Sequence, residues 1–373
     1  MDVEPTAGRR PPFVYWACLW LVGLSFALVL VFYDLARDSG APPGRDFANL
    51  YTAGKLALEG RAWEAFDVDL FRIALRDVFG RFVMQNYSYP PHAMLLAAPL
   101  ALLPYWVAFA AWTALSVGLF YKAARPHMPF APALAVLTPA AALNIWNGHY
   151  GLILGALWLF FFANRGAKAG WIASLMTIKP HMGLFIGLTA LRDWRTVAAA
   201  VAGTLALVAV SIALFEPASW YGFINNTLGE QTEILTRQSS EFYFQLMPSA
   251  YTAFGRGDLA IALQLIFGGL AAWLVIRSRR IDPFALATAT FLIVPYVFVY
   301  DMTVVCLGFA IIIWRDWATL SKGEKTILTL AFLVPNITLG LPALAPPILL
   351  AGLWVQTKRM SLECKAAGPA PLR

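Results

Sequence analysis

Asp46 stands at the start of a short amphipathic pattern in the N-terminal part of the chain. The apolar and aromatic residues at positions 47, 50, 51, 54 and 58 have the spacing of one helix face. Such a helix could lie along a membrane surface. The Asp46 carboxylate could then act as a general base, or it could cap the helix by accepting hydrogen bonds from the first backbone N–H groups. The pattern alone leaves both interpretations open.

Lys179-Pro180-His181 interrupts the apolar run 169–191, whose two ends carry basic residues. Because both ends of the run should therefore lie on the same side of the membrane, we expect two half-helices that meet at Pro180. This places Lys179 in the outer half of the bilayer, where a charge costs at least about 2.5–3.5 kcal/mol on insertion scales. Such a residue either binds a substrate group such as phosphate or forms a buried ion pair, and both remain open.

Two further patterns carry weaker signals. Tyr300-Asp301 lies between two apolar runs and either lines a site or marks an external turn. Asp67-Val68-Asp69 has the form of a D-x-D metal motif, but the same spacing is typical of a helix start. The sequence contains no glycine-rich nucleotide-binding motif, which argues against a cytosolic nucleotide-driven enzyme.

The elements that position these residues must be membrane-spanning helices. Of the 373 residues, 60% are apolar and only 13% are charged, whereas a typical soluble domain has about 25% charged residues. The mean hydropathy of +0.64 agrees with this excess. The apolar stretches are continuous rather than alternating, which excludes a β-barrel. The composition therefore predicts an all-α polytopic membrane protein and excludes soluble and disordered chains.

A first uncleaved span is expected over residues 13–32, because this apolar stretch is too long for a signal-peptide core. Further apolar runs lie near 92–120, 131–144, 150–163, 169–191, 196–215, 259–276, 284–314 and 326–355. The last two are too long for one crossing, and prolines divide the final one. We therefore expect about ten to twelve transmembrane helices in a single integral membrane domain, residues 1–373.

The charged residues divide between two sets of loops. Most of the 28 Lys and Arg residues fall on one side, which the positive-inside rule assigns to the cytoplasm. Most of the 21 Asp and Glu residues fall on the other side. There we expect two large extracytoplasmic loops, 34–91 with the amphipathic helix and 216–258. The net charge of +7 then requires no nucleic-acid partner, and Cys18, Cys306 and Cys364 lack the spacing of metal ligands.

Several motifs, taken in order, resemble those of glycosyltransferase family 87. The first-loop motif of that family is similar to Arg45-Asp46-Phe47 with Tyr51, Ala53-Gly54 and Leu58-Glu59-Gly60. Its later blocks are similar to Tyr89-Pro90-Pro91 with Pro99-Leu100 and Leu103-Pro104, Asn147-Gly148, Ile178-Lys179-Pro180, and Pro295-Tyr296 with Tyr300-Asp301. The resemblance covers roughly residues 40–305, and the C-terminal third is similar in hydropathy only.

The resemblance implies a GT-C fold and an inverting glycosyltransferase that uses a polyprenyl-phosphate sugar donor. It implies transfer of a hexosyl group, in this family mannosyl, to a lipid or glycan acceptor at the extracytoplasmic face of a bacterial inner membrane, among membrane lipids and with no cofactor. The family's catalytic first-loop aspartate corresponds to Asp46. Because Arg45 and Phe47 flank Asp46 where many such enzymes pair acidic residues, we expect no metal. The residues expected to bind the donor phosphate or the substrate are Lys179, Arg237, Asp301, Tyr300, His149 and Arg45.

Two other classes of protein would share parts of this pattern. A transporter or flippase of a lipid-linked sugar would explain the broken helices and the charges at Lys179 and Asp301. It would not explain a long external loop that begins with an amphipathic helix. A structural partner of an envelope-polymer machine would be insensitive to replacement of Asp46.

Overall fold

The computed structural model describes residues 10–36, 44–80, 86–227, 229, 232, 244–255, 257–278 and 280–367. The chain is 82% helical and has no strand within these ranges, so it is an all-α polytopic membrane protein, as the composition predicted. It divides into two compact units. Unit 1 consists of Met1–Ala27, Ala124–Ala142 and Ser240–Arg373, and unit 2 consists of Leu28–Ala123 and Leu143–Ser239.

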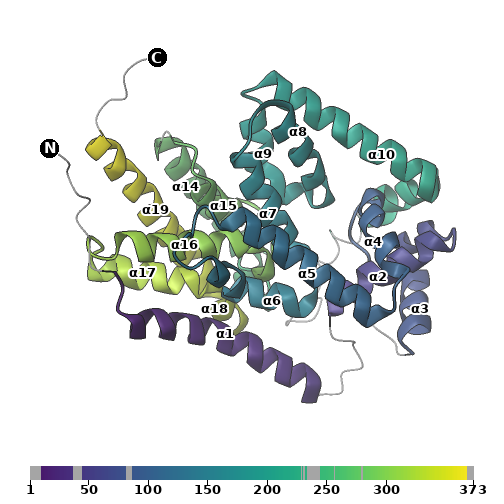
Figure 1. The fold of residues 1–373 in the computed structure, drawn as a ribbon, viewed down its shortest axis with the longest axis horizontal. Coiled ribbons are helices and arrows are strands. Elements are labelled where there is room, and N and C mark those ends of the chain that lie inside the picture. The colour runs from purple at the N-terminus through teal and green to yellow at the C-terminus, as the bar shows by residue number, and fades with distance from the viewer. Residues whose placement is uncertain are drawn as a thin grey trace. The chain divides into compact units, whose positions relative to one another are not determined.

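Unit 2 contains the Asp46 helix and the interrupted run around Lys179 (Figure 1). Its elements are α2 (Arg45–Leu58), η1 (Ala62–Phe66), α3 (Val68–Phe79), η2 (Pro91–Ala93), α4 (Met94–Ala101), α5 (Tyr105–Ala124), α7 (Gly151–Phe162), α8 (Gly166–Leu175), η4 (Met176–Ile178), η5 (Pro180–Gly183), α9 (Leu184–Ala190), α10 (Trp194–Gly222) and η6 (Phe223–Thr227). The last residue of α5 belongs to unit 1, and the helices α1 (Phe13–Ala36) and α6 (Pro139–Asn147) are divided between the units.

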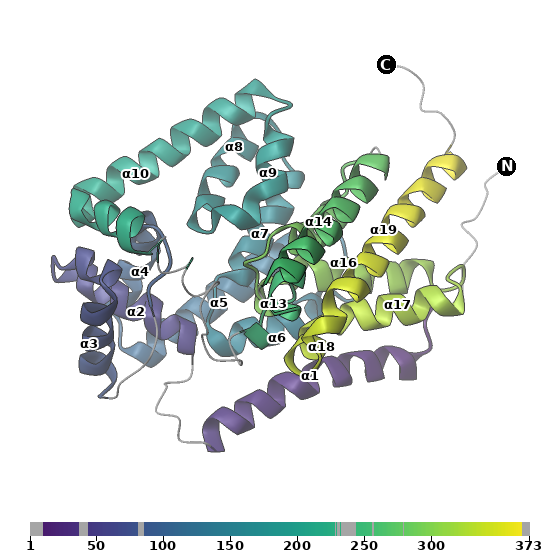
Figure 2. The same ribbon diagram turned by 180° about the vertical axis from the view of Figure 1, so that it is seen from behind.

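Unit 1 is built around packed helices from the C-terminal third of the chain, and Figure 2 shows α16 and α19 beside α17. Its elements are η3 (Pro132–Leu137), α13 (Ala250–Ala253), α14 (Asp258–Ser278), α15 (Pro283–Ile293), η7 (Val299–Asp301), α16 (Thr303–Asp316), α17 (Lys322–Phe332), α18 (Val334–Gly340), η8 (Pro342–Leu344) and α19 (Ala345–Ala367). Hydrophobic side chains such as Phe309, Phe332 and Leu353 are buried among them.

Several helices begin at residues whose side chains satisfy the first backbone N–H groups. Asp67 caps α3 by accepting from the backbone N–H groups of Asp69 and Leu70, at 3.1 and 3.0 Å. Asp282 caps α15 in the same way, directly before a proline, which suits the first position of a helix. The interpretation of Asp67-Val68-Asp69 as a helix start is therefore confirmed.

The helix predicted after Asp46 is present as α2, but it is enclosed on most of its circumference. Phe47, Leu50 and Tyr51 of the predicted stripe are buried, and so are Ala48 and Thr52 on the other faces. The reason is that α2 packs against α4, α3 and η1 within unit 2. Small residues on its second face allow this close packing, which a search for one apolar stripe does not detect.

The apolar run 169–191 is broken at Lys179 and Pro180, as its sequence predicted. It consists of α8, two short 3₁₀ helices, η4 and η5, and α9. Lys179 lies between the two 3₁₀ helices with φ −140° and ψ 74°, a backbone conformation that continues neither helix. Pro180 starts η5, where its missing N–H leaves no hydrogen bond unmade.

Within the part of the chain that the structure describes, three helical segments are long and apolar enough to cross a membrane: Tyr105–Ala124, Trp194–Thr227 and Asp258–Ser278. The second continues beyond the end predicted at residue 215, through a kink at Phe215 and Glu216 before Pro217. Shorter apolar helices are Phe13–Val29, Pro91–Ala101, Gly151–Phe162 and Pro283–Ile293. Breaks such as the one at Lys179 divide apolar runs into helices that are shorter than the thickness of the hydrocarbon core of a bilayer. The expected ten to twelve crossings therefore remain a prediction.

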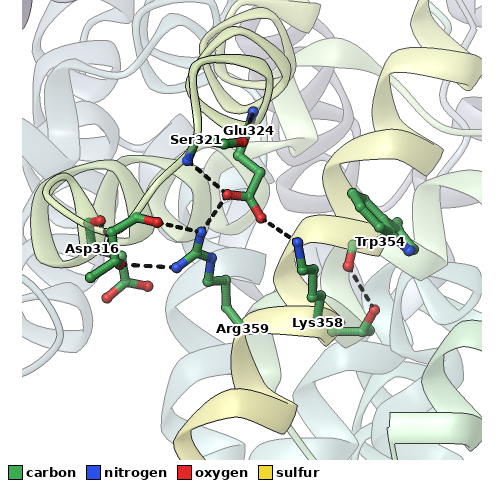
Figure 3. Close-up of polar contacts among 8 residues, drawn as sticks. Asp316, Ser321, Glu324, Trp354, Lys358 and Arg359 are labelled. Carbon is green, nitrogen blue, oxygen red and sulfur yellow. Dashed lines mark hydrogen bonds and ion pairs between the residues drawn. The ribbon is translucent and has the colours of Figure 1, made fainter.

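A buried carboxylate joins α17 to α19 in unit 1 (Figure 3). Glu324 accepts a hydrogen bond from the Ser321 backbone N–H at 2.9 Å and from Lys358 Nζ at 2.9 Å, and it forms an ion pair with Arg359. Arg359 also donates to the backbone oxygen of Thr319 at 3.0 Å. Burial raises the pKa of Glu324, but these donors outweigh burial and lower it to about 2.

Candidate active site

Asp46 is the second residue of α2, in the helix's first turn, and its side chain is partly buried. The N-cap position is occupied by Gly44, which has φ 77° and makes no side-chain cap hydrogen bond. The N-cap position therefore belongs to Gly44 rather than to Asp46. A carboxylate in the first turn is stabilised in its ionised form by the positive end of the helix dipole, and an ionised carboxylate is the form that accepts a proton.

The beginning of α2 packs against the turn after α6. Gly148 has φ 66°, and a Cβ added to it would lie 2.5 Å from the Phe47 Cβ. Trp112 Nε1 donates to the Gly148 carbonyl oxygen at 2.9 Å, which fixes the same turn from α5. Only glycine tolerates both this backbone conformation and this contact. The Asn147-Gly148 motif thus brings the residue next to Asp46 into contact with the turn that carries His149.

His149 is buried and connects this turn to the segment before η2. Its Nε2 atom lies 2.6 Å from the Tyr89 hydroxyl oxygen, within hydrogen-bond distance. The Tyr89 ring also packs on Tyr150, with ring centroids 4.6 Å apart, and on Tyr87, at 5.7 Å. Burial raises the pKa of the Tyr87 phenol, which therefore stays protonated. The Tyr-Pro-Pro motif of the sequence thus places Tyr89 beside His149.

The same segment continues to His92, which contacts the interrupted helix. His92 Nε2 lies 3.2 Å from Thr177 Oγ1, and Thr177 precedes Lys179 by two residues. Both His92 and Lys179 are buried, with 4% and 5% of their surfaces exposed. Trp220, in the part of α10 after its kink, stacks on the His92 ring, with centroids 5.9 Å apart.

We call five polar residues of unit 2 the polar row: Asp46, His149, Tyr89, His92 and Lys179. Tyr89 and His149 lie within hydrogen-bond distance of each other, and His92 lies within hydrogen-bond distance of Thr177, two residues before Lys179. The members of the polar row come from α2, the turn before α7, the segment around η2, and the break between η4 and η5. One end offers a carboxylate that can accept a proton, and the other offers a cation that can meet a phosphate. The residues between them can hydrogen-bond the hydroxyl groups of a sugar.

The remaining predicted site residues lie elsewhere. Arg45 is the first residue of α2, and its side chain is exposed next to Asp46. Tyr300 and Asp301 belong to unit 1, where both are buried in η7, a 3₁₀ turn rather than an exposed external turn. The Tyr300 ring stacks on Phe298 with centroids 5.0 Å apart. Arg237 lies outside the described residues.

Sequence reasoning did not assign Tyr89, His92 or Thr177 to the site. The available signal was the position of a polar residue beside a proline inside an apolar region. This signal identified Lys179 before Pro180, and it applies equally to His92 after Pro91. Thr177 could not be found in this way, because its role depends on a contact with a residue 85 positions away in the chain.

Comparison with known proteins gives one family. Residues 87–306 match the sequence model of glycosyltransferase family 87. No curated protein and no solved structure matches the chain. The matched segment contains His92, His149 and Lys179. Asp46 precedes this segment, and its neighbour Phe47 packs against Gly148 within it.

Proposed function

The chain belongs to glycosyltransferase family 87 and is a membrane glycosyltransferase, and we propose that it uses a polyprenyl-phosphate-linked sugar as donor. It transfers a hexosyl group, most simply mannosyl, to a lipid or glycan acceptor. The reaction takes place at the extracytoplasmic face of a bacterial inner membrane and inverts the anomeric carbon. The orientation is supported by the distribution of charged residues between the loops.

The observation that carries this proposal is the polar row. It comprises a partly buried carboxylate at Asp46, a buried cation at Lys179, two histidines and a tyrosine, all in one compact unit. A sugar phosphate has complementary chemistry, since its phosphate needs a cation and its hydroxyl groups need hydrogen-bond partners. An apolar helix such as α10, with Leu205 and Leu214 exposed, offers a surface for the polyprenyl chain.

The proposed reaction is a single displacement. The Asp46 carboxylate accepts the proton of the acceptor hydroxyl as its oxygen attacks the anomeric carbon of the donor. The bond between the anomeric carbon and the phosphate oxygen breaks, and the polyprenyl phosphate leaves with the electron pair. Attack from the face opposite the leaving group inverts the anomeric centre. The products are the glycosylated acceptor, a protonated Asp46 and polyprenyl phosphate, and Asp46 then releases its proton to water.

In this proposal Lys179 stabilises the leaving phosphate. Lys179 is only 5% exposed, and a cation in the interior interacts strongly with an anion because the interior screens charges less than water does. His149 holds the hydroxyl group of Tyr89 by a hydrogen bond. We assign Arg45, Arg237, Tyr300 and Asp301 to substrate binding on the family resemblance alone.

A transporter of lipid-linked sugars is the rival function, and the broken helices around Lys179 favour it. The two functions differ in their products. A transferase releases polyprenyl phosphate and forms a new glycosidic bond, whereas a transporter returns the donor unchanged on the other side of the membrane.

The test uses the purified full-length protein in liposomes with polyprenyl-phosphate mannose and an extract of membrane lipids as acceptor. We expect release of polyprenyl phosphate together with a mannosylated lipid, both measured by mass spectrometry. Donor that moves across the bilayer without release of polyprenyl phosphate would support the transporter instead. Intact donor with no movement and no product would contradict both functions for this substrate.

A further inference from the structure

His92 is enclosed by three parts of unit 2 and takes no part in the proposed displacement. It lies in η2, its Nε2 atom is 3.2 Å from Thr177 Oγ1, and its ring stacks on Trp220 with an interplanar angle of 21°. Trp220 is itself fixed by a hydrogen bond from its Nε1 atom to Ser211 Oγ, at 2.9 Å. The ring of His92 is therefore held in one orientation from two sides.

The hydrogen bonds determine which nitrogen of His92 carries the proton. The Thr177 hydroxyl has one proton, and it donates this proton to the Ser174 carbonyl oxygen at 2.5 Å. The Thr177 oxygen must then act as acceptor toward His92, so His92 Nε2 is the donor. A neutral imidazole protonated on Nε2 has a lone pair on Nδ1. His92 Nδ1 is accordingly a hydrogen-bond acceptor.

This acceptor is buried without a partner. His92 is 4% exposed, and no residue in the described part of the chain gives Nδ1 a hydrogen bond. Burial of an unpaired acceptor is unfavourable, and a hydrogen-bond donor that reached Nδ1 would relieve this cost. The structure thus presents a fixed lone pair that needs an O–H or N–H group.

We propose that His92 Nδ1 accepts a hydrogen bond from a hydroxyl group of the sugar carried by the donor. This inference rests on the proposed function, because it assumes that a sugar phosphate occupies the polar row. The phosphate itself is excluded as the partner, since an ionised phosphate offers no hydrogen to donate and would face a lone pair. The polyprenyl chain has no polar hydrogen. The sugar adjoins the phosphate, and its hydroxyl groups are good hydrogen-bond donors. His92 is held by Thr177, two residues before the Lys179 that we propose to bind the phosphate.

Two neighbouring residues position His92 rather than contacting the sugar. Thr177 selects the tautomer by accepting from Nε2, and Trp220 sets the plane of the ring. Thr177→Val should remove this selection, because valine has nearly the same shape but offers Nε2 no hydrogen-bond acceptor. His92 can then carry its proton on either ring nitrogen. Discrimination between donor analogues should then weaken while the donor still binds.

The test of the His92 assignment measures equilibrium binding of polyprenyl-phosphate mannose and its monodeoxy analogues to the full chain in lipid nanodiscs. His92→Gln keeps an N–H donor that can reach Thr177 but lacks an acceptor at the position of Nδ1. We expect the wild type to bind one analogue about 10-fold or more weakly than the parent donor. His92→Gln should bind that analogue and the parent with the same affinity, whereas the control His127→Gln, in unit 1, should keep the wild-type ratio.

The measured affinities, rather than the rate of turnover, distinguish the possible outcomes. Equal affinities of all analogues for the wild type would show that Nδ1 contacts no sugar hydroxyl, and would overturn the assignment of His92 while leaving the transferase intact. The same loss for one analogue in wild type and His92→Gln would also overturn it, since another residue must then accept that hydroxyl. No binding of any sugar donor by the wild type would contradict both the proposed donor and the assignment.

Discussion

Asp46 is not needed to begin its own helix. Gly44 occupies the N-cap, with Tyr105 donating to its carbonyl oxygen at 3.2 Å, so the helix begins at Gly44 rather than at Asp46. Its position in the first turn favours the ionised form. Asparagine has nearly the same shape as aspartate and keeps a hydrogen-bond acceptor, so Asp46→Asn tests the role of the charge.

We expect Asp46→Asn to fold and to bind the donor like the wild type, yet to lose transfer by at least about 100-fold, because an amide accepts no proton from the acceptor hydroxyl. The measurement is kcat for release of polyprenyl phosphate. The control is Asp69→Asn, which removes the same charge from an exposed position in the first turn of α3 and should retain wild-type turnover. Near-normal turnover of Asp46→Asn would remove it as the base.

Lys179→Gln should weaken binding of the donor by about 10-fold or more, because the variant lacks the cation that meets the phosphate. All sugar analogues should be affected equally, since the phosphate is common to them. Lys179→Arg should restore only part of the affinity, because a planar guanidinium differs in shape from a compact ammonium. Lys168→Gln, at an exposed position near the start of α8, is the matched control. Unchanged donor affinity in Lys179→Gln would assign Lys179 a structural role.

Among the elements, α2 and α4 pack together without room for another methyl group. A Cβ added to Gly54 would lie 2.6 Å from the carbonyl carbon of Ala97, a backbone atom that cannot move aside easily. Gly54→Ala should therefore separate the two helices and lower the melting temperature. Gly118→Ala, in α5, meets nothing within 4 Å and should leave the melting temperature unchanged or raise it. A melting temperature for Gly54→Ala equal to that of Gly118→Ala would contradict the close approach.

The contact between α17 and α19 should depend on pH through Glu324. The pKa of Glu324 in the folded protein is about 2, below the value of about 4.3 for an unperturbed glutamate. A lowered pKa means that the stabilisation is complete above the unfolded value and is lost as the pH falls toward 2. Between about pH 5 and about pH 3, the melting temperature of the wild type should thus fall by more than that of Glu324→Gln. Parallel losses in both proteins would exclude Glu324 as the titrating group.

The sequence predicted those elements whose signals are local. Asp67 and the Lys179–Pro180 break are examples, because a cap and a proline act on their own neighbours. It did not predict the enclosure of α2, since this depends on small residues such as Gly54 meeting another helix. The polar row was found only at Asp46, His149 and Lys179, because Tyr89 and His92 join it through contacts that are distant in the chain.

Each unit carries apolar side chains on its surface whose exposure to water would be unfavourable. In unit 2 the exposed side chains of α10 include Val201, Leu205 and Leu214, and in unit 1 those of α14 include Leu265 and Ile276. Patches of this kind are suited to lipid rather than to water. The membrane therefore provides the environment of both units, and the charged loops decide which end of each helix faces the cytoplasm.

The orientation can be tested at two exposed positions on loops of opposite predicted side. Asp77 lies in the acidic loop 34–91, and its side chain is 63% exposed, whereas Lys322 lies at the exposed start of α17 among basic residues. In a variant without the three native cysteines, Asp77→Cys should react with a membrane-impermeant maleimide on intact cells, because this loop is predicted on the side opposite the loops that hold most of the Lys and Arg residues. Lys322→Cys should react only after the membrane is permeabilised.

This labelling pattern decides where the chemistry occurs, because Asp46 and Asp77 belong to the same predicted loop. External access to Asp77→Cys alone would support an extracytoplasmic active site and a donor whose sugar faces outward. The reverse pattern, with external access to Lys322→Cys alone, would place Asp46 in the cytoplasm. The donor would then meet the enzyme on the side where nucleotide sugars are abundant, and a lipid-linked donor would no longer be required by the location of the site.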